Sequence, residues 1–207
     1  MLDINFEYKA LFYNDAKYKY RRYLEIRNKE YNEENDLTVV MMNPGSSKPK
    51  NIDETIDNEF LNKLVEVHPD PTQYQIKKIM DACKFNYAKV INLSDIRDGN
   101  SASFYKKLHL DLSFVDHSIF SDNNEIYLKD YLNPKSDFLF CWGVNKKLTP
   151  LVNLALFRIE KLFSKNIKIY GLKHSKNKLG YYHPLPRTND SQKKWVEDVI
   201  SQIKNGR

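Results

Sequence analysis

The chain has 207 residues with 33 basic and 27 acidic side chains, so its formal net charge at pH 7 is +6. A hydrophobic content of 41% excludes a disordered chain, and two cysteines are too few for a disulfide scaffold or a cysteine-rich zinc site. The apolar runs fall short of the roughly 20 residues that cross a membrane, and the first residues lack the order of a signal peptide, so we expect a soluble, cytoplasmic protein without membrane association.

Two strands joined by a turn are predicted at the amino end. Residues 5–13 and 18–26 are rich in tyrosine, phenylalanine and isoleucine, and a turn-prone Asn-Asp pair separates them. We expect this strand pair, within residues 1–30, to pack on the remainder of the chain. Because the sequence contains no repeat, linker or low-complexity tract, we expect residues 1–207 to form a single domain.

Four short apolar runs further along the chain predict buried strands. They cover residues 37–42, 87–93, 136–143 and 167–172. Segments with helical periodicity lie between and after these runs. They cover residues 72–84, about 123–132, 145–163 and the stretch from about Asp190. Unbroken apolar strands that alternate with helices are typical of parallel sheets. The pattern therefore predicts an α/β fold with a mainly parallel four-stranded central sheet, flanked by helices, and the extra amino-terminal strand pair.

Ligands of such sheets bind at the carboxyl ends of the strands, so the residues that follow each run are the candidates for a site. These are Asn43-Pro44-Gly45-Ser46-Ser47, then Asn92, then Trp142-Gly143, and after a loop His183-Pro184-Leu185. Each has an ordinary structural explanation when taken alone: Asn43 as a helix cap, Asn92 as a tie for a loop, and His183 as a partner for a carbonyl group. A phosphate-binding loop, a dinucleotide fingerprint and metal-spaced histidines are missing from the sequence.

The order of these motifs resembles that of the uracil-DNA glycosylase superfamily. In that superfamily the first strand ends in Asp-Pro or Asn-Pro, a later strand presents an Asn, and a His-Pro-Ser loop closes the active site. The stretch VVMMNPGSS looks like the Asn-Pro-Gly form of the mismatch-specific branch, and FLFCWG resembles the strand that precedes the final motif. The resemblance implies a fold of the same kind and DNA as the partner.

A resemblance that covers residues 6–186 is to the bacterial and phage domain-of-unknown-function family sixteen forty-three. The matching stretches are MMNPGSS, Asp53-Glu54-Thr55-Ile56, Val90-Ile91-Asn92-Leu93 with Arg97, Cys141-Trp142-Gly143 and His183-Pro184-Leu185. This family has no assigned activity. It implies the glycosylase-like order of motifs and occurrence on phages and mobile genetic elements.

The glycosylase resemblance implies a chemical role for each motif residue. Asn43 would orient the attacking water, although an amide cannot act as a general base. His183 would donate a hydrogen bond to the base oxygen on which negative charge develops. Asn92 would pair with a pyrimidine edge through one donor and one acceptor, and Pro44 and Gly45 would contact the flipped base.

Contacts with DNA are predicted from the distribution of charge. Residues 161–207 contain eleven basic and three acidic side chains, a net charge of +8, whereas the remainder of the chain is close to neutral. Clustered basic residues favour phosphate binding, although most lysine-rich stretches are simply solvated. The expected contacts are the backbone amides at Ser46 and Ser47, if they open a helix, and the side chains of Lys173, Lys176, Lys178, Leu185 and Arg187, with Leu185 or Arg187 filling the gap left by a flipped base.

These expectations describe a DNA-binding protein with a uracil-DNA glycosylase-like site that excises a modified or deaminated base, as a hydrolase of N-glycosidic bonds without a metal or cofactor. The alternatives are a non-catalytic nucleic-acid-binding protein of the same fold and an enzyme that acts on free nucleotides. An Asn at residue 43 in place of a carboxylate favours slow chemistry or none. The sequence leaves open the target base, the strandedness of the DNA, and which of Tyr74, Phe104 and Tyr105 stacks on the base.

Overall fold

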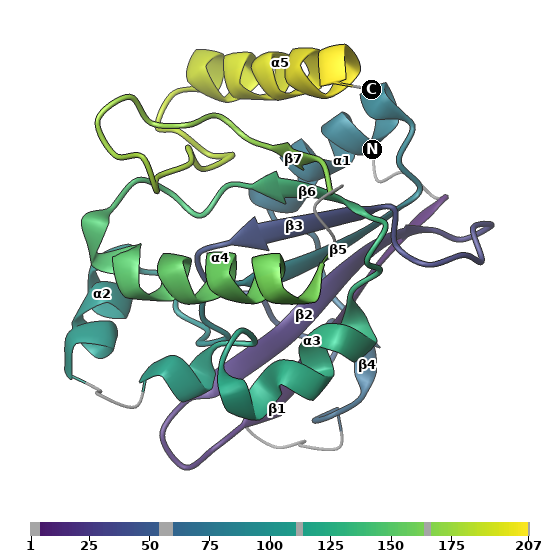
Figure 1. Ribbon diagram of the computed structural model, residues 1–207. Helices are drawn as coiled ribbons and strands as arrows, with labels where there is room; N and C mark the ends of the chain where they lie inside the picture. Colours follow the sequence, from purple (N-terminus) through teal and green to yellow (C-terminus); the bar gives the residue numbers. More distant parts are fainter. Residues whose placement is uncertain (1–4, 54–59, 111–113, 164–166, 207) are drawn as a thin grey trace.

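The computed structural model describes residues 5–53, 60–110, 114–163 and 167–206 (Figure 1). Within them, a seven-stranded mixed sheet forms the centre of the molecule, with its strands in the order β4-β1-β2-β5-β3-β6-β7. The strands are β1 (Phe6–Asn14), β2 (Lys19–Asn28), β3 (Leu37–Met41), β4 (Leu64–Glu66), β5 (Tyr87–Asn92), β6 (Asp137–Phe140) and β7 (Ile169–Tyr170). The helices are α1 (Pro71–Cys83), α2 (Ser101–Leu110), α3 (Glu125–Tyr131), α4 (Thr149–Leu162) and α5 (Asn189–Gly206).

The predicted α/β class is confirmed, but the prediction of a mainly parallel four-stranded sheet is wrong. The four predicted runs form β3, β5, β6 and β7, which do pair in parallel, in the order β5-β3-β6-β7. The amino-terminal pair extends this sheet instead of packing on it, because β2 pairs antiparallel with β5 and β1 pairs antiparallel with β2. A strand pattern indicates which residues are buried, but it does not indicate which neighbour completes the backbone hydrogen bonds.

The short strand β4 adds to the outer edge of β1. It has three residues and shows no buried side chain, so no apolar pattern indicates it in the sequence. Residues 54–56 of the Asp-Glu-Thr-Ile motif lie outside the described residues. Among the described residues, no helix is long and apolar enough to cross a membrane.

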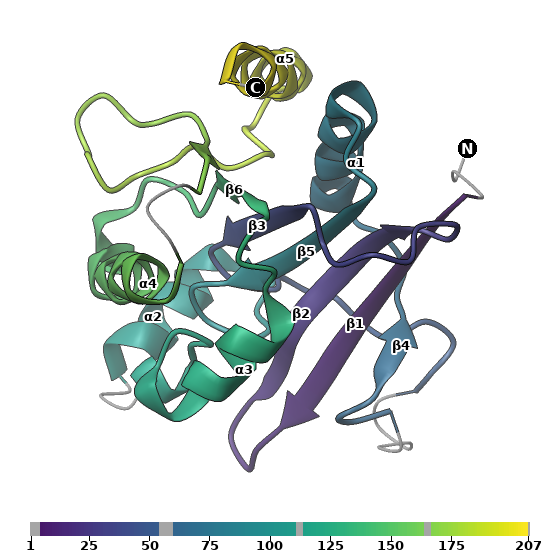
Figure 2. The same ribbon diagram turned by 45° about the vertical axis from the view of Figure 1, so that its right-hand side comes forward.

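Helices cover both faces of the sheet. α1 and α5 lie side by side on one face, and α2, α3 and α4 lie on the other (Figure 2). Along β3, Leu37, Val39 and Met41 belong to the core beneath α1 and α5, whereas Val40 belongs to the core on the opposite face. Both faces of this strand are therefore buried, which explains its unbroken apolar run.

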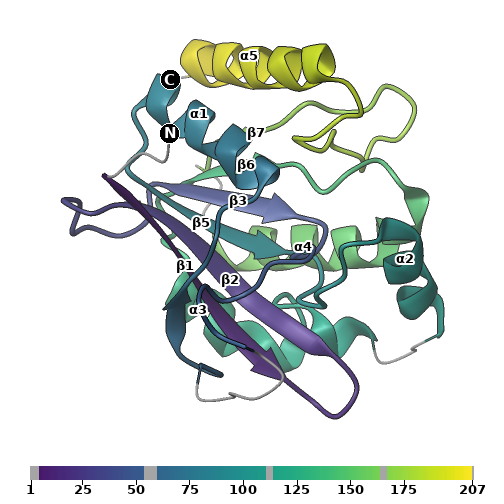
Figure 3. The same ribbon diagram turned by 180° about the vertical axis from the view of Figure 1, so that it is seen from behind.

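The parallel strands β3 and β5 point toward the end of the molecule where α2 lies (Figure 3). The loops that follow the parallel strands meet at this end of the sheet. They carry the Asn-Pro-Gly, Trp-Gly and His-Pro motifs, so the sheet topology brings together segments that are far apart in the chain.

Candidate functional site

A pocket lies at the carboxyl ends of β3 and β5, against the first turn of α1, and we call it the central pocket. Its lining comes from residues 41–45, the start of α1 with its cap Asp70, and residues 98, 99 and 101 after β5, together with Arg21 of β2, Val90 of β5 and His183. Its cavity volume is about 230 Å³, which suits a small group and not a whole drug-sized ligand. The Asn-Pro-Gly motif and the His-Pro loop therefore meet at one site.

Asn43 joins two of the loops that surround the central pocket. Its Nδ2 donates hydrogen bonds to the carbonyl oxygens of Ile96 (3.3 Å) and Asp98 (2.8 Å). Because both amide hydrogens are used, Oδ1 is the side-chain atom left to accept a hydrogen bond from a molecule in the pocket. Asn43 therefore anchors the loop after β5 and does not cap a helix. Its two hydrogen bonds fix the orientation of its amide.

The Asn-Pro-Gly turn depends on Gly45, whose φ of +64° favours glycine. Directly after it, the chain packs against Gly99, where an added Cβ would lie 3.1 Å from the Cβ of Ser46. Residues 46–53 form turns and irregular structure without a helix. The backbone amides of Ser46 and Ser47 therefore do not open a helix, which was the condition for their predicted phosphate contact. Ser46 is exposed, whereas Ser47 is buried.

Asn92, which was predicted to bind the base, does not line the central pocket. It is the last residue of β5 and 0% exposed, and neither its Nδ2 nor its Oδ1 has a hydrogen-bond partner among the described residues. It pairs with Met41, which lines the pocket, but it does not line the pocket itself. An unpartnered buried amide is costly, and at 0% exposure Asn92 is not accessible to a ligand in this arrangement. Contact with a base edge would require the pocket wall to open.

His183 is oriented by its own loop. Its Nδ1 accepts a hydrogen bond from the backbone N–H of Leu185 (3.1 Å), which leaves Nε2 to carry the proton of the neutral ring. Burial lowers the pKa of His183 to about 4, against the opposing negative charge of Asp70. At neutral pH the ring is therefore uncharged and has one N–H to donate.

The loop that carries His183 is anchored by the Trp-Gly motif after β6. Nε1 of Trp142 donates a hydrogen bond to the carbonyl oxygen of Leu179 (2.8 Å). The backbone N–H of Gly143 donates to the carbonyl oxygen of Tyr181 (2.8 Å). The Trp-Gly motif thus positions the loop without lining the central pocket.

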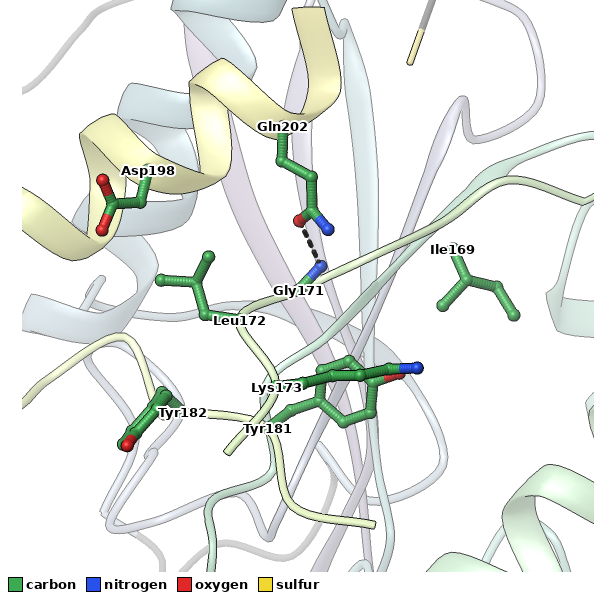
Figure 4. Close-up of a pocket in the computed structure, with 8 residues that line it drawn as sticks. All are labelled: Ile169, Gly171, Leu172, Lys173, Tyr181, Tyr182, Asp198 and Gln202. Carbon is green, nitrogen blue, oxygen red and sulfur yellow. Dashed lines mark hydrogen bonds between the residues drawn. The ribbon is translucent and has the colours of Figure 1, made fainter. Parts of the chain in front are cut away.

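The basic residues of the carboxyl-terminal segment are not placed at the central pocket. The predicted DNA contacts of this segment, none of which lines the pocket, are Lys173, Lys176, Lys178, Leu185 and Arg187. Lys173 lines a second pocket beside β7 and α5, where Gln202 accepts a hydrogen bond from the backbone N–H of Gly171 (2.8 Å; Figure 4). The basic side chains of this segment therefore do not line the central pocket.

A basic pocket of about 500 Å³ adjoins the central pocket and shares Gly45, Asp98 and Gly99 with it. Its basic side chains are Lys17, Lys19, Lys48, Arg97 and Lys107. Asp98 is the one acidic residue in its lining, and it is paired with Lys107 (2.6 Å). Tyr18 adds an aromatic ring. Basic side chains beside an aromatic ring suit the phosphates and bases of a nucleic acid.

Sequence reasoning missed several residues of the central pocket, among them Arg21, Asp70 and Gln73. The sequence does indicate Asp70 and Gln73 as a helix cap, because Asp-Pro-Thr-Gln is a capping-box pattern. In the structure Asp70 accepts from the backbone N–H of Gln73 (2.9 Å), and the Gln73 side chain accepts from the backbone N–H of Asp70 (3.1 Å). Arg21 had no such signal, because adjacent arginines in an edge strand indicate a solvated surface.

The candidates for base stacking do not line the central pocket. Phe104 is 0% exposed and belongs to the core under α4. Tyr105 donates a hydrogen bond from its hydroxyl to Sδ of Met42 (3.2 Å), and Tyr74 is 40% exposed on α1. Tyr18 lines the basic pocket, so its ring is a better candidate for stacking on a base than these three side chains.

No protein-family model, no curated protein and no solved structure matches this chain. Its function is therefore inferred from the chemistry of the central and basic pockets.

Proposed function

We propose that this protein binds DNA and that its central pocket is a uracil-DNA glycosylase-like site, which excises a modified or deaminated base. The observation that carries the proposal is that Asn43 and His183, far apart in the chain, line one pocket at the carboxyl ends of parallel strands. These residues occupy the motifs that resemble the water-orienting and base-contacting positions of that superfamily. Membership of the superfamily fold is part of the same proposal.

In the proposed reaction, a water oxygen bonds to C1′ of the deoxyribose as the bond from C1′ to the base nitrogen breaks. The bonding electron pair leaves with the base, and the negative charge spreads to a base oxygen, to which Nε2–H of His183 donates. The proton lost by the water passes to solvent or to the departing base. Oδ1 of Asn43 accepts a hydrogen bond from the water and orients it, but an amide takes up no proton near pH 7. We therefore expect slow turnover.

The basic pocket supports DNA as the substrate in preference to a free nucleotide. A nucleotide that is extruded from a strand remains attached to phosphates on both sides, and basic side chains next to the central pocket would hold them. The central pocket shares part of its lining with these basic residues, so one strand can contact both.

A glycosylase assay tests the proposal. Oligonucleotides that carry uracil, thymine mismatches or hydroxymethylated bases are incubated with the protein, and abasic sites are detected as alkali-labile strand breaks. We expect breaks with the wild type and with Asn32→Ala, an exposed control, and at least a tenfold lower rate with Asn43→Ala. Because Asn43 also ties a loop, the unfolding midpoint of each variant is measured alongside the rate.

Two other outcomes identify the alternative functions. Salt-sensitive DNA binding without abasic product on any of these oligonucleotides indicates a non-catalytic nucleic-acid-binding protein. Release of a base from free nucleotides but not from oligonucleotides indicates an enzyme on nucleotides. A protein that does not bind DNA at low salt contradicts both DNA-based functions.

A further inference from the structure

One residue of the central pocket is a buried arginine. Arg21 is 3% exposed and lines the pocket. Its Nε and Nη1 are buried without a hydrogen-bond partner, and its guanidinium forms no ion pair with the described residues. The nearby charges that act on it are those of Asp70 and Asp95, which attract it, and of Arg97, which repels it.

A β-bulge in the amino-terminal hairpin aims Arg21 at the pocket. Leu11 pairs with Tyr23, but the next residue of β1, Phe12, pairs with Arg21, so Arg22 is the extra residue. Paired residues share a face of the sheet, and Phe12 belongs to the core beneath α1 and α5. Arg21 therefore points to the α1 face. In a regular hairpin Arg22 would occupy this position, because each one-residue shift reverses the face.

A buried guanidinium without an ion-pair partner is costly, because the attraction of Asp70 and Asp95 compensates only part of its desolvation. Burial and the nearby Arg97 lower the pKa of Arg21 to about 10, so the side chain remains protonated at pH 7. The cationic form is retained although it destabilises the ligand-free protein. Bulges and unpartnered buried groups of this kind are concentrated at binding sites, where a ligand supplies the missing partner.

The first turn of α1 adds donors at the same place. The backbone N–H of Gln73 is used by the Asp70 side chain, and that of Tyr74 by the Asp70 carbonyl. Thr72 lines the pocket, and its backbone N–H takes part in neither of these two hydrogen bonds. The positive end of the helix favours an anion, whereas the Asp70 carboxylate opposes one. Arg21 is therefore the main source of attraction.

We propose that Arg21 binds an oxyanion of the ligand in the central pocket, through the paired donors of its guanidinium. The inference rests on the proposed function for one point, that the ligand is a nucleotide. Two kinds of oxygen in a nucleotide carry negative charge that a guanidinium can bind. One is a phosphate oxygen, and the other is the base oxygen on which charge develops as the base departs. Arg21 would hold the phosphate in the first case, and would stabilise the leaving group together with His183 in the second.

Isothermal titration calorimetry tests the proposal with deoxyuridine 5′-monophosphate, deoxyuridine and inorganic phosphate as probes. The proteins compared are the wild type, Arg21→Met, Arg21→Lys, and Lys135→Met as a control that removes an exposed positive charge outside both the central and the basic pocket. We expect the wild type and the control to bind the monophosphate equally. Arg21→Met should bind it at least tenfold more weakly, and Arg21→Lys should lie between them, because lysine keeps the charge but loses the paired donors.

The probes separate the two sources of the oxyanion. A loss confined to the monophosphate and inorganic phosphate assigns Arg21 to a phosphate, and an equal loss with deoxyuridine assigns it to the base. The proposal is overturned if Arg21→Met binds every probe as tightly as the wild type, or if the wild type binds none of them.

A structural role for Arg21 is tested by thermal unfolding without ligand. We expect the midpoint of Arg21→Met to equal or exceed that of the wild type, because an uncompensated buried charge is removed. A clear fall in the midpoint would show that Arg21 is structural. The inference and the proposed function can fail separately. Arg21-dependent binding without base excision contradicts the glycosylase alone, and normal excision by Arg21→Met contradicts this inference alone.

Discussion

His183 illustrates how one residue is tuned by its immediate surroundings. The N–H of Leu185 occupies Nδ1, and burial lowers the pKa of the ring to about 4. A neutral imidazole that carries its proton on Nε2 can donate a hydrogen bond to a base oxygen without adding a second positive charge beside that of Arg21. The His-Pro motif indicates the position of this residue, but its protonation follows from packing around the loop.

The tautomer and the pKa of His183 can be measured by nitrogen-detected NMR of the imidazole ring. We expect a neutral ring protonated on Nε2 throughout pH 5–8, and protonation only near pH 4. The pKa of His183 is lower in the folded chain than in the unfolded chain, where it is about 6.5. Between about pH 4 and pH 6.5, the unfolded chain therefore binds more protons than the folded chain. His183 therefore contributes stability above about pH 6.5, and this contribution is lost as the pH falls toward 4. Titration near pH 6.5 would contradict the desolvation of the ring in the pocket.

At the scale of an element, the bulge in the β1–β2 hairpin sends two adjacent arginines to opposite faces of the sheet. Arg21 points to the central pocket without an ionic partner. Arg22 forms an ion pair with the buried Asp95 (2.9 Å) and stacks over the rings of Tyr13 and Tyr127. Two neighbouring residues of one type therefore have different roles, one toward a ligand and one within the fold.

Replacement of Arg22 should have the opposite effect on stability to replacement of Arg21. Arg22→Met leaves the Asp95 carboxylate buried without its cation, and we expect a loss of about 3–5 kcal/mol in the free energy of unfolding at pH 8. Burial already raises the pKa of Asp95 to about 7 with Arg22 present, so the carboxyl takes up a proton below that pH. The loss should therefore be smaller at pH 5 than at pH 8. Urea denaturation at both pH values measures it, and equal losses would contradict the ion-pair explanation.

At the scale of the whole molecule, positive charge gathers where the linear sequence does not show it. The amino-terminal hairpin contributes Lys17 and Lys19 to the basic pocket, and the loops after β3 and β5 contribute Lys48 and Arg97. These residues belong to the part of the chain that is nearly neutral overall. Extension of the sheet by β1 and β2 brings the hairpin turn next to the central pocket.

The salt dependence of DNA binding distinguishes the two basic regions. The double variant Lys17→Ala/Lys19→Ala should reduce the slope of log K against log salt by about 2, because each lost phosphate contact on duplex DNA removes about 0.9. The matched variant Lys176→Ala/Lys178→Ala should leave the slope unchanged. Fluorescence anisotropy with a labelled duplex at several salt concentrations measures both. The reverse result would place the DNA on the carboxyl-terminal segment.

The order of amino acids alone was enough to predict the α/β class, the segments of the four parallel strands, and an Asn-Pro-Gly turn and a His-Pro loop near strand ends. Burial periodicity and turn preference are properties of short segments, so they can be read locally. The antiparallel extension of the sheet, the burial of Asn92 and the partnerless Arg21 could not be read in this way. They depend on which strands pair and on a one-residue bulge, and those are set by packing between segments that are distant in the chain.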